Sequence, residues 1–234
     1  MSEADPAREL REQGVALLRG AFETQLLARL KLAAERCFEA VESEGAIAER
    51  CGFNRFSHSV PITALRDFGC HKADLLAPTA TPGVASIISV IMNCEWECRM
   101  DQSWVRKKFA PNQSPAREYH LQGWHQDGAL GVSFPVEPEH VPPMNELLTC
   151  WIPLDPCGVD SPGLEFVRGR QQRLLHFTEL ADSGLQQRFP SDQFWAPELV
   201  FGDGLIFLNS VLHRTFVRPG MRENRISVEY RIFP

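Results

Sequence analysis

Short apolar segments, each closed by glycine, proline or other turn residues, make up the second half of the chain. From about residue 94, Trp96, Cys98 and Met100 alternate with polar neighbours, which is the period-two pattern of a strand. Four prolines in 133–145 exclude a central strand there, and 111–115 has the composition of a turn. Further strands are predicted at 147–155, 161–169, 199–210 and 225–233. Many short strands with such turns are typical of an all-β barrel or jelly roll.

The first part of the chain has a different pattern. Residues 14–20 resemble a short strand, and apolar residues then recur at intervals of three and four, which predicts an amphipathic helix over 23–44. Residues 83–94 follow Pro82 and favour a helix, although their β-branched side chains also permit a strand. The fold class is therefore α+β and mainly β. We expect one domain over 1–234, with a helical part at about 20–93 and a β core at about 94–234. A polar loop with a short helix, able to cover a site, is expected over 171–197.

Charge and composition limit the partners of the protein. The 234 residues carry a net charge of −6, so neither nucleic acid nor an anionic membrane surface is an expected partner. The N-terminal segment MSEADPAREL is charged, and no stretch approaches the ~20 apolar residues of a membrane span. This predicts a soluble, cytoplasmic protein. The seven cysteines lack CxxC spacing and are expected to be reduced and mostly buried, with Cys94 and Cys98 on one strand face.

The segment GWHQDGAL, residues 123–130, contains a candidate metal site. In an extended segment, His125 and Asp127 point to one face, where a nitrogen and an oxygen can bind the same cation. The pair alone is weak evidence because chance produces it easily. His213, in a loop after the apolar strand 205–208, is the best third ligand. Two imidazoles and one carboxylate match non-haem Fe(II) oxygenases, while a zinc hydrolase with the same ligands remains an alternative.

An oxygenase of this class also needs a cation for the distal carboxylate of its keto-acid co-substrate, and a planar guanidinium binds a carboxylate well. On the predicted strand 225–233, Arg225, Ser227, Glu229 and Arg231 share one face. Arg225 and Ser227 are the expected carboxylate clamp, and Arg222 is the second candidate. A structural ion pair between Arg225 and a neighbouring glutamate is the alternative.

Other polar residues near the motif carry weaker signals. Gln122, Trp124 and Gln126 flank the candidate ligands and are candidates to line a pocket. Arg106, Lys107 and Lys108 are interpreted as the solvated edge of a strand. The alternative is that one of them helps to hold the keto acid. Five histidines have no partner at ligand spacing and are expected to be surface or hydrogen-bonded residues: His58, His71, His120, His140 and His176. Of these, His120 is the candidate for a substrate contact.

Four ordered blocks of the sequence resemble the phytanoyl-CoA dioxygenase family of Fe(II)/2-oxoglutarate-dependent oxygenases. They are GWHQDG, LLTCWIPLDPCGVDSPGLEFVRGRQ, FGDGLIFLNSVLHRT and RISVEYR. The opening GVALLRGAF is also similar to the start of that family. The resemblance covers roughly 14–50 and 83–231, and the four blocks are specific in combination. VRGRQ, residues 167–171, departs from the Pro-Gly-Ser-His type of turn that is usual there.

The resemblance implies a double-stranded β-helix, a jelly-roll or cupin-like core on which N-terminal helices pack. It implies iron ligands at His125, Asp127 and His213. It also implies 2-oxoglutarate contacts at Arg225, Trp151 and Thr215. Trp151 is equally well explained as a core tryptophan, because buried aromatic residues are normally packing residues.

The expected function follows from these residues. The protein is predicted to use Fe(II), 2-oxoglutarate and O2 to hydroxylate a small organic molecule, with release of succinate and CO2. Secondary metabolites are the favoured substrates, because an acidic chain without a phosphate cradle does not favour an acyl-CoA. Asp127 argues against halogenation, because related halogenases have a small residue there. Desaturation or cyclisation at the same site, and a non-catalytic β-barrel binding protein, are the alternatives. The sequence pattern implies no particular oligomeric state.

Overall fold

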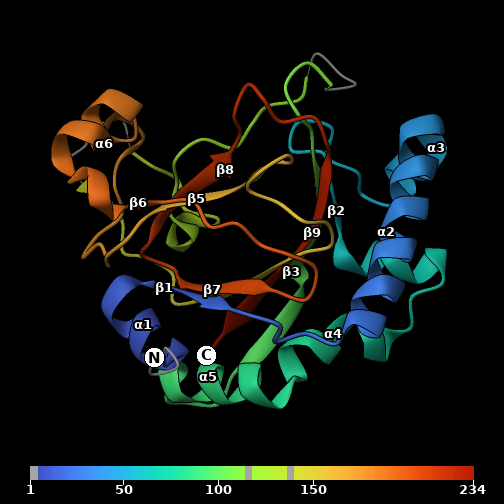
Figure 1. The fold of residues 1–234 in the computed structure, drawn as a ribbon, viewed down its shortest axis with the longest axis horizontal. Helices are drawn as coiled ribbons and strands as arrows, with labels where there is room; N and C mark the ends of the chain where they lie inside the picture. The colour runs from blue at the N-terminus through green and yellow to red at the C-terminus, as the bar shows by residue number, and fades with distance from the viewer. Residues whose placement is uncertain (1–4, 114–117, 136–139) are drawn as a thin grey trace.

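Two antiparallel sheets face each other, and helices cover the outer face of the larger one (Figure 1). The computed structural model describes residues 5–113, 118–135 and 140–234. The larger sheet has the strand order β1-β7-β4-β9-β3-β2, and the smaller has the order β6-β5-β8. This arrangement confirms the predicted fold class, mainly β with N-terminal helices packed on the core.

The strand at 225–233 has its predicted bounds, those within 14–20, 147–155, 161–169 and 199–210 are shorter than predicted, and three short strands were not predicted. The described strands confirm the predicted succession. They are β1 (Val15–Leu18), β2 (Ser59–Pro61), β3 (Glu97–Lys108), β4 (Leu148–Pro153), β5 (Gly163–Val167), β6 (Phe194–Trp195), β7 (Gly204–Leu208), β8 (Leu212–Phe216) and β9 (Arg225–Phe233). Because β3 begins at Glu97, Cys94 lies before it and is exposed. The prediction that Cys94 and Cys98 share a strand face is therefore wrong. Five of the seven cysteines are buried, and all seven are unpaired.

The described helices include three that agree with the sequence-based predictions and three that were not predicted. They are α1 (Pro6–Gln13), α2 (Thr24–Ser43), α3 (Gly45–Arg50), α4 (Lys72–Ala80), α5 (Pro82–Met92) and α6 (Asp182–Arg188). Short 3₁₀ turns include η1 (Ile62–Phe68), η2 (Asp127–Ala129) and η4 (Phe177–Glu179). The predictions at 23–44 and 83–94 correspond to α2 and α5, and Pro82 is tolerated because the first turn needs no N–H donor. The short helix expected within 171–197 corresponds to α6.

Three further observations bear on the sequence-based expectations. No strand occurs at 133–135 or 140–145, and 136–139 lie outside the described residues. A turn is present at 111–112, whereas 114–115 of the predicted turn lie outside the described part of the chain. Of the helices described, none by itself is long and apolar enough to cross a membrane, and only α4 and α5 together, bent by 64°, reach that length and composition.

The alternation of side chains along β9 separates the packing face of the large sheet from its functional face. Ile226, Val228, Tyr230 and Ile232 belong to the buried cluster that the sheet forms with the helices. The intervening polar residues, Arg225 to Arg231, are on the opposite face, toward the small sheet, because successive side chains of a strand point to opposite sides. The predicted shared face of these four polar residues therefore borders the space between the sheets.

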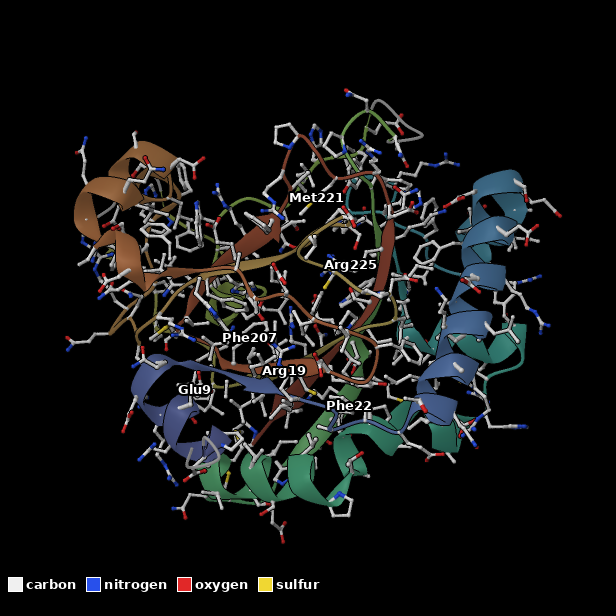
Figure 2. All side chains as sticks on the ribbon, in the orientation of Figure 1. Glu9, Arg19, Phe22, Phe207, Met221 and Arg225 are labelled. Carbon is white, nitrogen blue, oxygen red and sulfur yellow. The ribbon has the colours of Figure 1, made fainter. Side chains whose placement is uncertain are left out.

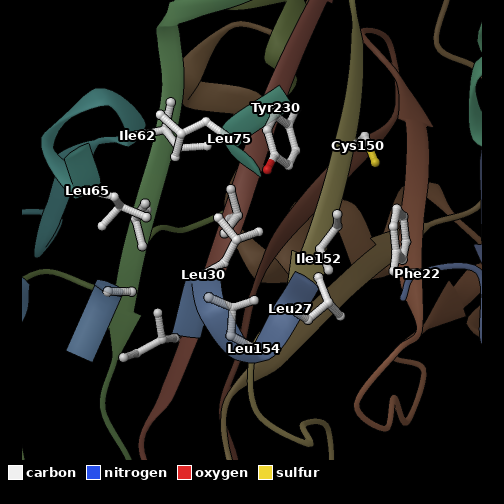
Figure 3. Close-up of a cluster of buried hydrophobic side chains, with 14 of the residues drawn as sticks. Phe22, Leu27, Leu30, Ile62, Leu65, Leu75, Cys150, Ile152, Leu154 and Tyr230 are labelled. Carbon is white, nitrogen blue, oxygen red and sulfur yellow. The ribbon is translucent and has the colours of Figure 1, made fainter. Parts of the chain in front are cut away.

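Both faces of the large sheet are packed with apolar side chains. On the outside, Leu27 and Leu30 of α2 belong to one cluster with Ile152 and Leu154 (Figure 3). On the inside, a second cluster contains Trp151 and residues of both sheets. Packing on both faces holds the inward polar residues of the central strands in a rigid frame.

Candidate metal centre

The structure brings together His125, Asp127 and His213. Each offers a ligand atom, and these atoms lie within 4.8 Å of one another. His213 is in β8 rather than in the predicted loop, and its backbone exchanges two 3.0 Å hydrogen bonds with that of His125. Asp127 begins η2, so the extended segment that was expected ends one residue before it. Among the described residues, this is the one group of three or more His, Cys, Asp or Glu side chains with such spacing.

The two imidazoles are oriented by backbone carbonyls. Nδ1 of His125 is 2.8 Å from the Gly123 carbonyl oxygen, and Nδ1 of His213 is 3.2 Å from that of Val211. Because a carbonyl accepts but cannot donate, each Nδ1 carries the proton and each Nε2 keeps its lone pair. The Nε2 atoms lie 3.8 Å and 3.7 Å from Oδ1 of Asp127. Three donor atoms therefore converge on a common point.

The protonation states also suit metal binding. Burial, with a contribution from the neighbouring imidazole of His213, lowers the pKa of His125 to about 3. Burial likewise lowers the pKa of His213. Burial opposes the ionisation of Asp127, but Arg231 and the two neighbouring imidazoles together outweigh burial and lower the pKa of this carboxyl. Two neutral imidazoles and one carboxylate are the forms in which these groups bind a metal.

A small cavity between the sheets adjoins the two histidines. Its lining includes both rings, and it also includes Trp151, Thr215 and Arg225, three of the residues predicted to contact 2-oxoglutarate. Figure 2 shows Arg225 within the space that the sheets enclose. Ser227, the fourth, accepts a hydrogen bond from Nη1 of Arg225 and is fully buried.

Arg225 is a buried cation without an acidic partner among the described residues. It is 1% exposed, its Nε donates to the Pro162 carbonyl at 2.8 Å, and its Nη1 donates to the Ser227 hydroxyl. Its guanidinium carbon lies 4.8 Å from the centre of the Trp151 ring. Burial lowers the pKa of Arg225. Because an unpaired buried charge is costly, this arrangement favours the binding of an anion in the cavity. The second candidate, Arg222, is exposed and does not line the cavity.

Lys108 is a second cation in this cavity. It is 1% exposed, and its Nζ donates to the Ser57 carbonyl at 2.9 Å. Burial, together with the nearby charges of Arg106 and Arg225, lowers the pKa of Lys108 to about 7. The prediction of a solvated strand edge is therefore wrong for Lys108. It is also wrong for Arg106, which lines the cavity.

The reason lies in the position of β3 within the sheet. β3 pairs with β9 on one side and with β2 on the other, so it is not an edge strand. Val105 packs in the cluster under the helices, and Lys107 on the same face donates to Glu42 of α2 at 2.6 Å. Arg106 and Lys108 consequently point the other way, into the cavity. The period-two alternation around Val105 is the sequence signal that identifies these two residues.

The remaining predicted pocket residues separate into two groups. The amide nitrogen of Gln122 lies 2.8 Å from Nε2 of His125, and Gln122 lines the cavity. Trp124 instead donates to Asp182, and Gln126 bonds the backbone of Arg173 and Ser210, so neither lines the cavity.

The five other histidines are surface or hydrogen-bonded residues, as expected. His58 is buried and bonded to Glu42 at 2.8 Å, and His176 is buried and caps η4. The other three, His71, His120 and His140, are exposed. His120 stacks on Phe56 and does not line the cavity beside the metal centre.

Comparison with known proteins identifies a family and a shared fold. The family described as Phytanoyl-CoA dioxygenase (PhyH) matches residues 10–217. Among curated proteins, none matches this sequence at a significant level. Several solved structures share the fold at low sequence identity, and three of them are described below.

The epimerase SnoN, in complex with Fe3+, alpha ketoglutarate and nogalamycin RO, is 14% identical, with 97% of this chain and 82% of SnoN covered and a TM-score of 0.67. The non-heme alpha ketoglutarate dependent carbocyclase SnoK from nogalamycin biosynthesis is 17% identical, with coverage of 98% and 83% and a TM-score of 0.67. EvdO2 from Micromonospora carbonacea var. aurantiaca, complexed with 2-oxoglutarate, is 19% identical, with coverage of 100% and 92% and a TM-score of 0.64. At these identities the likeness shows the fold, and it confirms the predicted double-stranded β-helix.

Proposed function

We propose that this chain, which belongs to the phytanoyl-CoA dioxygenase (PhyH) family, is an Fe(II)- and 2-oxoglutarate-dependent dioxygenase that hydroxylates a small organic molecule. The observation that carries the proposal is the shared cavity. It contains the imidazole rings of two candidate ligands and, in the same enclosed space, the cation Arg225, which has no carboxylate partner among the described residues. A dicarboxylate with a keto group fits both features at once.

The donor set fits Fe(II). His125, Asp127 and His213 supply two neutral nitrogens and one anionic oxygen from one side, and such a set leaves further coordination positions open. The same atoms are acceptable to zinc, so the metal-binding residues alone do not distinguish an oxygenase from a hydrolase. The buried cations beside them favour the oxygenase, because a zinc hydrolase has no requirement for a second anion-binding group at this place.

The charges of the side chains that line the cavity suit 2-oxoglutarate. Arg225 and Ser227 would hold its distal carboxylate, and Lys108 adds a second positive charge in the same space. Trp151 and Phe207 would keep water away from the bound co-substrate, because both are buried and line the cavity. Glu229 is the one carboxylate among the described lining residues, and Arg106 binds it through two hydrogen bonds of 3.0 Å. The cavity therefore keeps an excess of positive charge for a dianion.

Fe(II) and 2-oxoglutarate, when bound, supply an oxidation by O2 in which the co-substrate leaves as succinate and CO2 and one oxygen atom enters the organic substrate. The protein side chains hold the reactants in place. The two histidines stay neutral, Asp127 stays ionised, and the guanidinium of Arg225 fixes the orientation of the dicarboxylate. The natural substrate is proposed to be a secondary metabolite.

A second outcome at the same site is oxidative cyclisation or desaturation. SnoK, which shares the fold over nearly the whole chain, is described as a carbocyclase, so this fold is compatible with such an outcome. Both outcomes consume 2-oxoglutarate and O2 and release succinate. They differ in the product, which retains an added oxygen atom only after hydroxylation.

The proposal is tested with metal-free protein under anaerobic conditions. Adding Fe(II) and then 2-oxoglutarate should produce the weak visible absorption of a chelated Fe(II) keto acid, and admission of air should yield succinate. The same protein loaded with zinc should give neither signal. Stoichiometric Fe(II) binding without visible absorption or succinate would contradict the proposed dioxygenase activity and favour a non-catalytic binding protein.

The affinity for 2-oxoglutarate should depend on pH through Lys108. Its pKa of about 7 means that it is charged below pH 7 and largely neutral above it. A bound dianion favours the charged form, so binding should be tighter at pH 6 than at pH 8. Because binding is coupled to one proton, the dissociation constant for 2-oxoglutarate changes by at most about tenfold per pH unit. Anaerobic titration between pH 6 and 8.5 measures this.

Lys108→Met supplies the control for the pH dependence. Arg106 and Glu229 bind each other and Arg225 stays charged, so the variant should bind 2-oxoglutarate more weakly and with a flat pH profile. An unchanged profile in Lys108→Met would assign the dependence to another group.

A further inference from the structure

A series of alternating buried charges leads from β3 to the candidate metal centre. Arg231 of β9 donates from Nη2 to Oδ1 of Asp127 at 2.9 Å, and from Nη1 to the hydroxyl of Thr149 at 2.9 Å. Thr149 donates to Oδ2 of Asp127 at 2.5 Å. Both oxygens of the candidate ligand are therefore held by donors from neighbouring strands.

The guanidinium of Arg231 is held in turn. Its Nη2 also donates to Oε1 of Glu229, and Glu229 accepts two hydrogen bonds from Arg106. Burial opposes the ionisation of Glu229, but the charges of Arg106 and Arg231 outweigh burial and lower its pKa. Glu229 is therefore an anion at neutral pH. It fixes a cation that would otherwise have rotational freedom about its long side chain.

Strand register explains how these residues meet. Thr149 of β4 lies directly opposite Arg231 of β9, and Glu229 lies opposite Trp104 of β3, two positions before Arg106. A spacing of two keeps all of these polar side chains on the inner face of the sheet. Three adjacent strands therefore supply every member of the series except Asp127, which belongs to η2.

The charges in this series cancel. Asp127 and Glu229 carry one negative charge each, and Arg106 and Arg231 carry one positive charge each. Arg231 thus differs from Arg225, which has no carboxylate partner among the described residues. A co-substrate anion does not need Arg231, and Arg231 already has two carboxylates to bind.

We propose that Arg231 is a positioning residue for Asp127, an inference that rests on the proposed metal centre. Arg231, which is itself held by Glu229, keeps Oδ1 of Asp127 at 3.7–3.8 Å from the Nε2 atoms of the two histidines. Arg106 holds Glu229 in turn. Rotation of the carboxylate would break its hydrogen bonds to Arg231 and Thr149. Asp127 is thus kept with Oδ1 near both Nε2 atoms, so a bound metal would not have to order this carboxylate.

A purely structural role makes a different prediction. If Arg231 only neutralises a buried carboxylate, its replacement lowers the stability of the fold but leaves the metal affinity of the folded protein unchanged. If Arg231 positions Asp127, its replacement lowers the metal affinity of the folded protein. Metal binding therefore distinguishes the two roles without any measurement of turnover.

The test uses Co(II) binding to the metal-free protein, followed by visible absorption without 2-oxoglutarate. Arg231→Lys keeps the charge but loses the planar fork, and it should bind Co(II) about 10- to 100-fold more weakly, the usual effect of losing a group that orients a metal ligand. Glu229→Gln should act in the same direction with a smaller loss. The control is Arg99→Lys, because Arg99 lies opposite Arg231 in the β3 and β9 register but binds exposed Glu97 instead. Its Co(II) affinity should be unchanged.

A double-variant cycle shows whether Arg231 acts through Asp127. In the Asp127→Ala background, Arg231→Lys should cause no further loss of Co(II) affinity. An affinity of folded Arg231→Lys within twofold of the wild type, or an equal loss in the Asp127→Ala background, would overturn the proposal. If Arg231→Lys does not fold, Glu229→Gln decides, and an unchanged affinity in that variant counts against positioning. Failure of the wild-type protein to bind Co(II) would instead contradict the proposed metal centre itself.

Discussion

Replacing His213 with alanine should abolish tight Fe(II) binding and stop 2-oxoglutarate-dependent succinate formation. The variant removes one of three donor atoms, and no other described His, Cys, Asp or Glu side chain joins this cluster to replace it. The loss of metal affinity should exceed the roughly 10- to 100-fold that follows from losing an outer partner of a ligand. Equilibrium dialysis measures Fe(II) binding, and succinate is measured in the same samples.

Two companion variants control for the fold. His213 packs between Phe166 and Phe207, with ring centres 5.7 Å and 4.6 Å away, so alanine also opens a cavity. His213→Gln keeps more of the side-chain volume and should still fail to bind Fe(II) tightly. His71→Ala changes an exposed histidine before α4 and should behave as the wild type. Wild-type Fe(II) affinity in folded His213→Ala would remove His213 from the metal centre.

Replacing Arg225 with methionine should weaken 2-oxoglutarate binding strongly and leave Fe(II) binding intact. The guanidinium is buried, and the loss of one partner of a buried, hydrogen-bonded charge pair typically costs about 2–5 kcal/mol. This corresponds to roughly a 30-fold to several-thousand-fold increase in the dissociation constant. Anaerobic titration of the Fe(II) protein measures it. In a thermal melt, 2-oxoglutarate should raise the Tm of the wild type but not that of Arg225→Met.

Arg222→Met is the matched control. Arg222 is exposed, precedes Arg225 by three residues and does not line the cavity, so its replacement should leave 2-oxoglutarate binding unchanged. A large loss in Arg222→Met together with a small one in Arg225→Met would move the anchor to Arg222.

The sequence reveals the family resemblance because the residues that carry the chemistry lie in short local patterns. His125 and Asp127 are two residues apart, and the strand that contains Arg225 and Ser227 alternates regularly. These patterns depend on the two-residue repeat of an extended chain, which is a local property of the backbone. The apolar periodicity of 23–44 is local in the same way, and the helix α2 follows it closely.

Other features depend on which strands become neighbours. In the sequence, Arg106, Lys107 and Lys108 look like one solvated basic run, but β2 and β9 enclose β3 on both sides. The alternation then sends Lys107 to Glu42 and buries Lys108 in the cavity. The sequence predicts a loop at His213, but the structure makes this residue part of the small sheet by pairing β8 with β5.

The sequence by itself determined the types of ligand, the strand-rich fold class and the face on which the polar residues of 225–233 lie. The tertiary structure alone decided that Arg231 reaches Asp127, that Lys108 is buried and that Arg225 lacks a carboxylate partner among the described residues. The physical reason is the range of the interactions. Periodicity acts over a few residues, whereas the burial of a charge and its pairing depend on strands more than 60 residues apart, whose register the whole packed sheet determines.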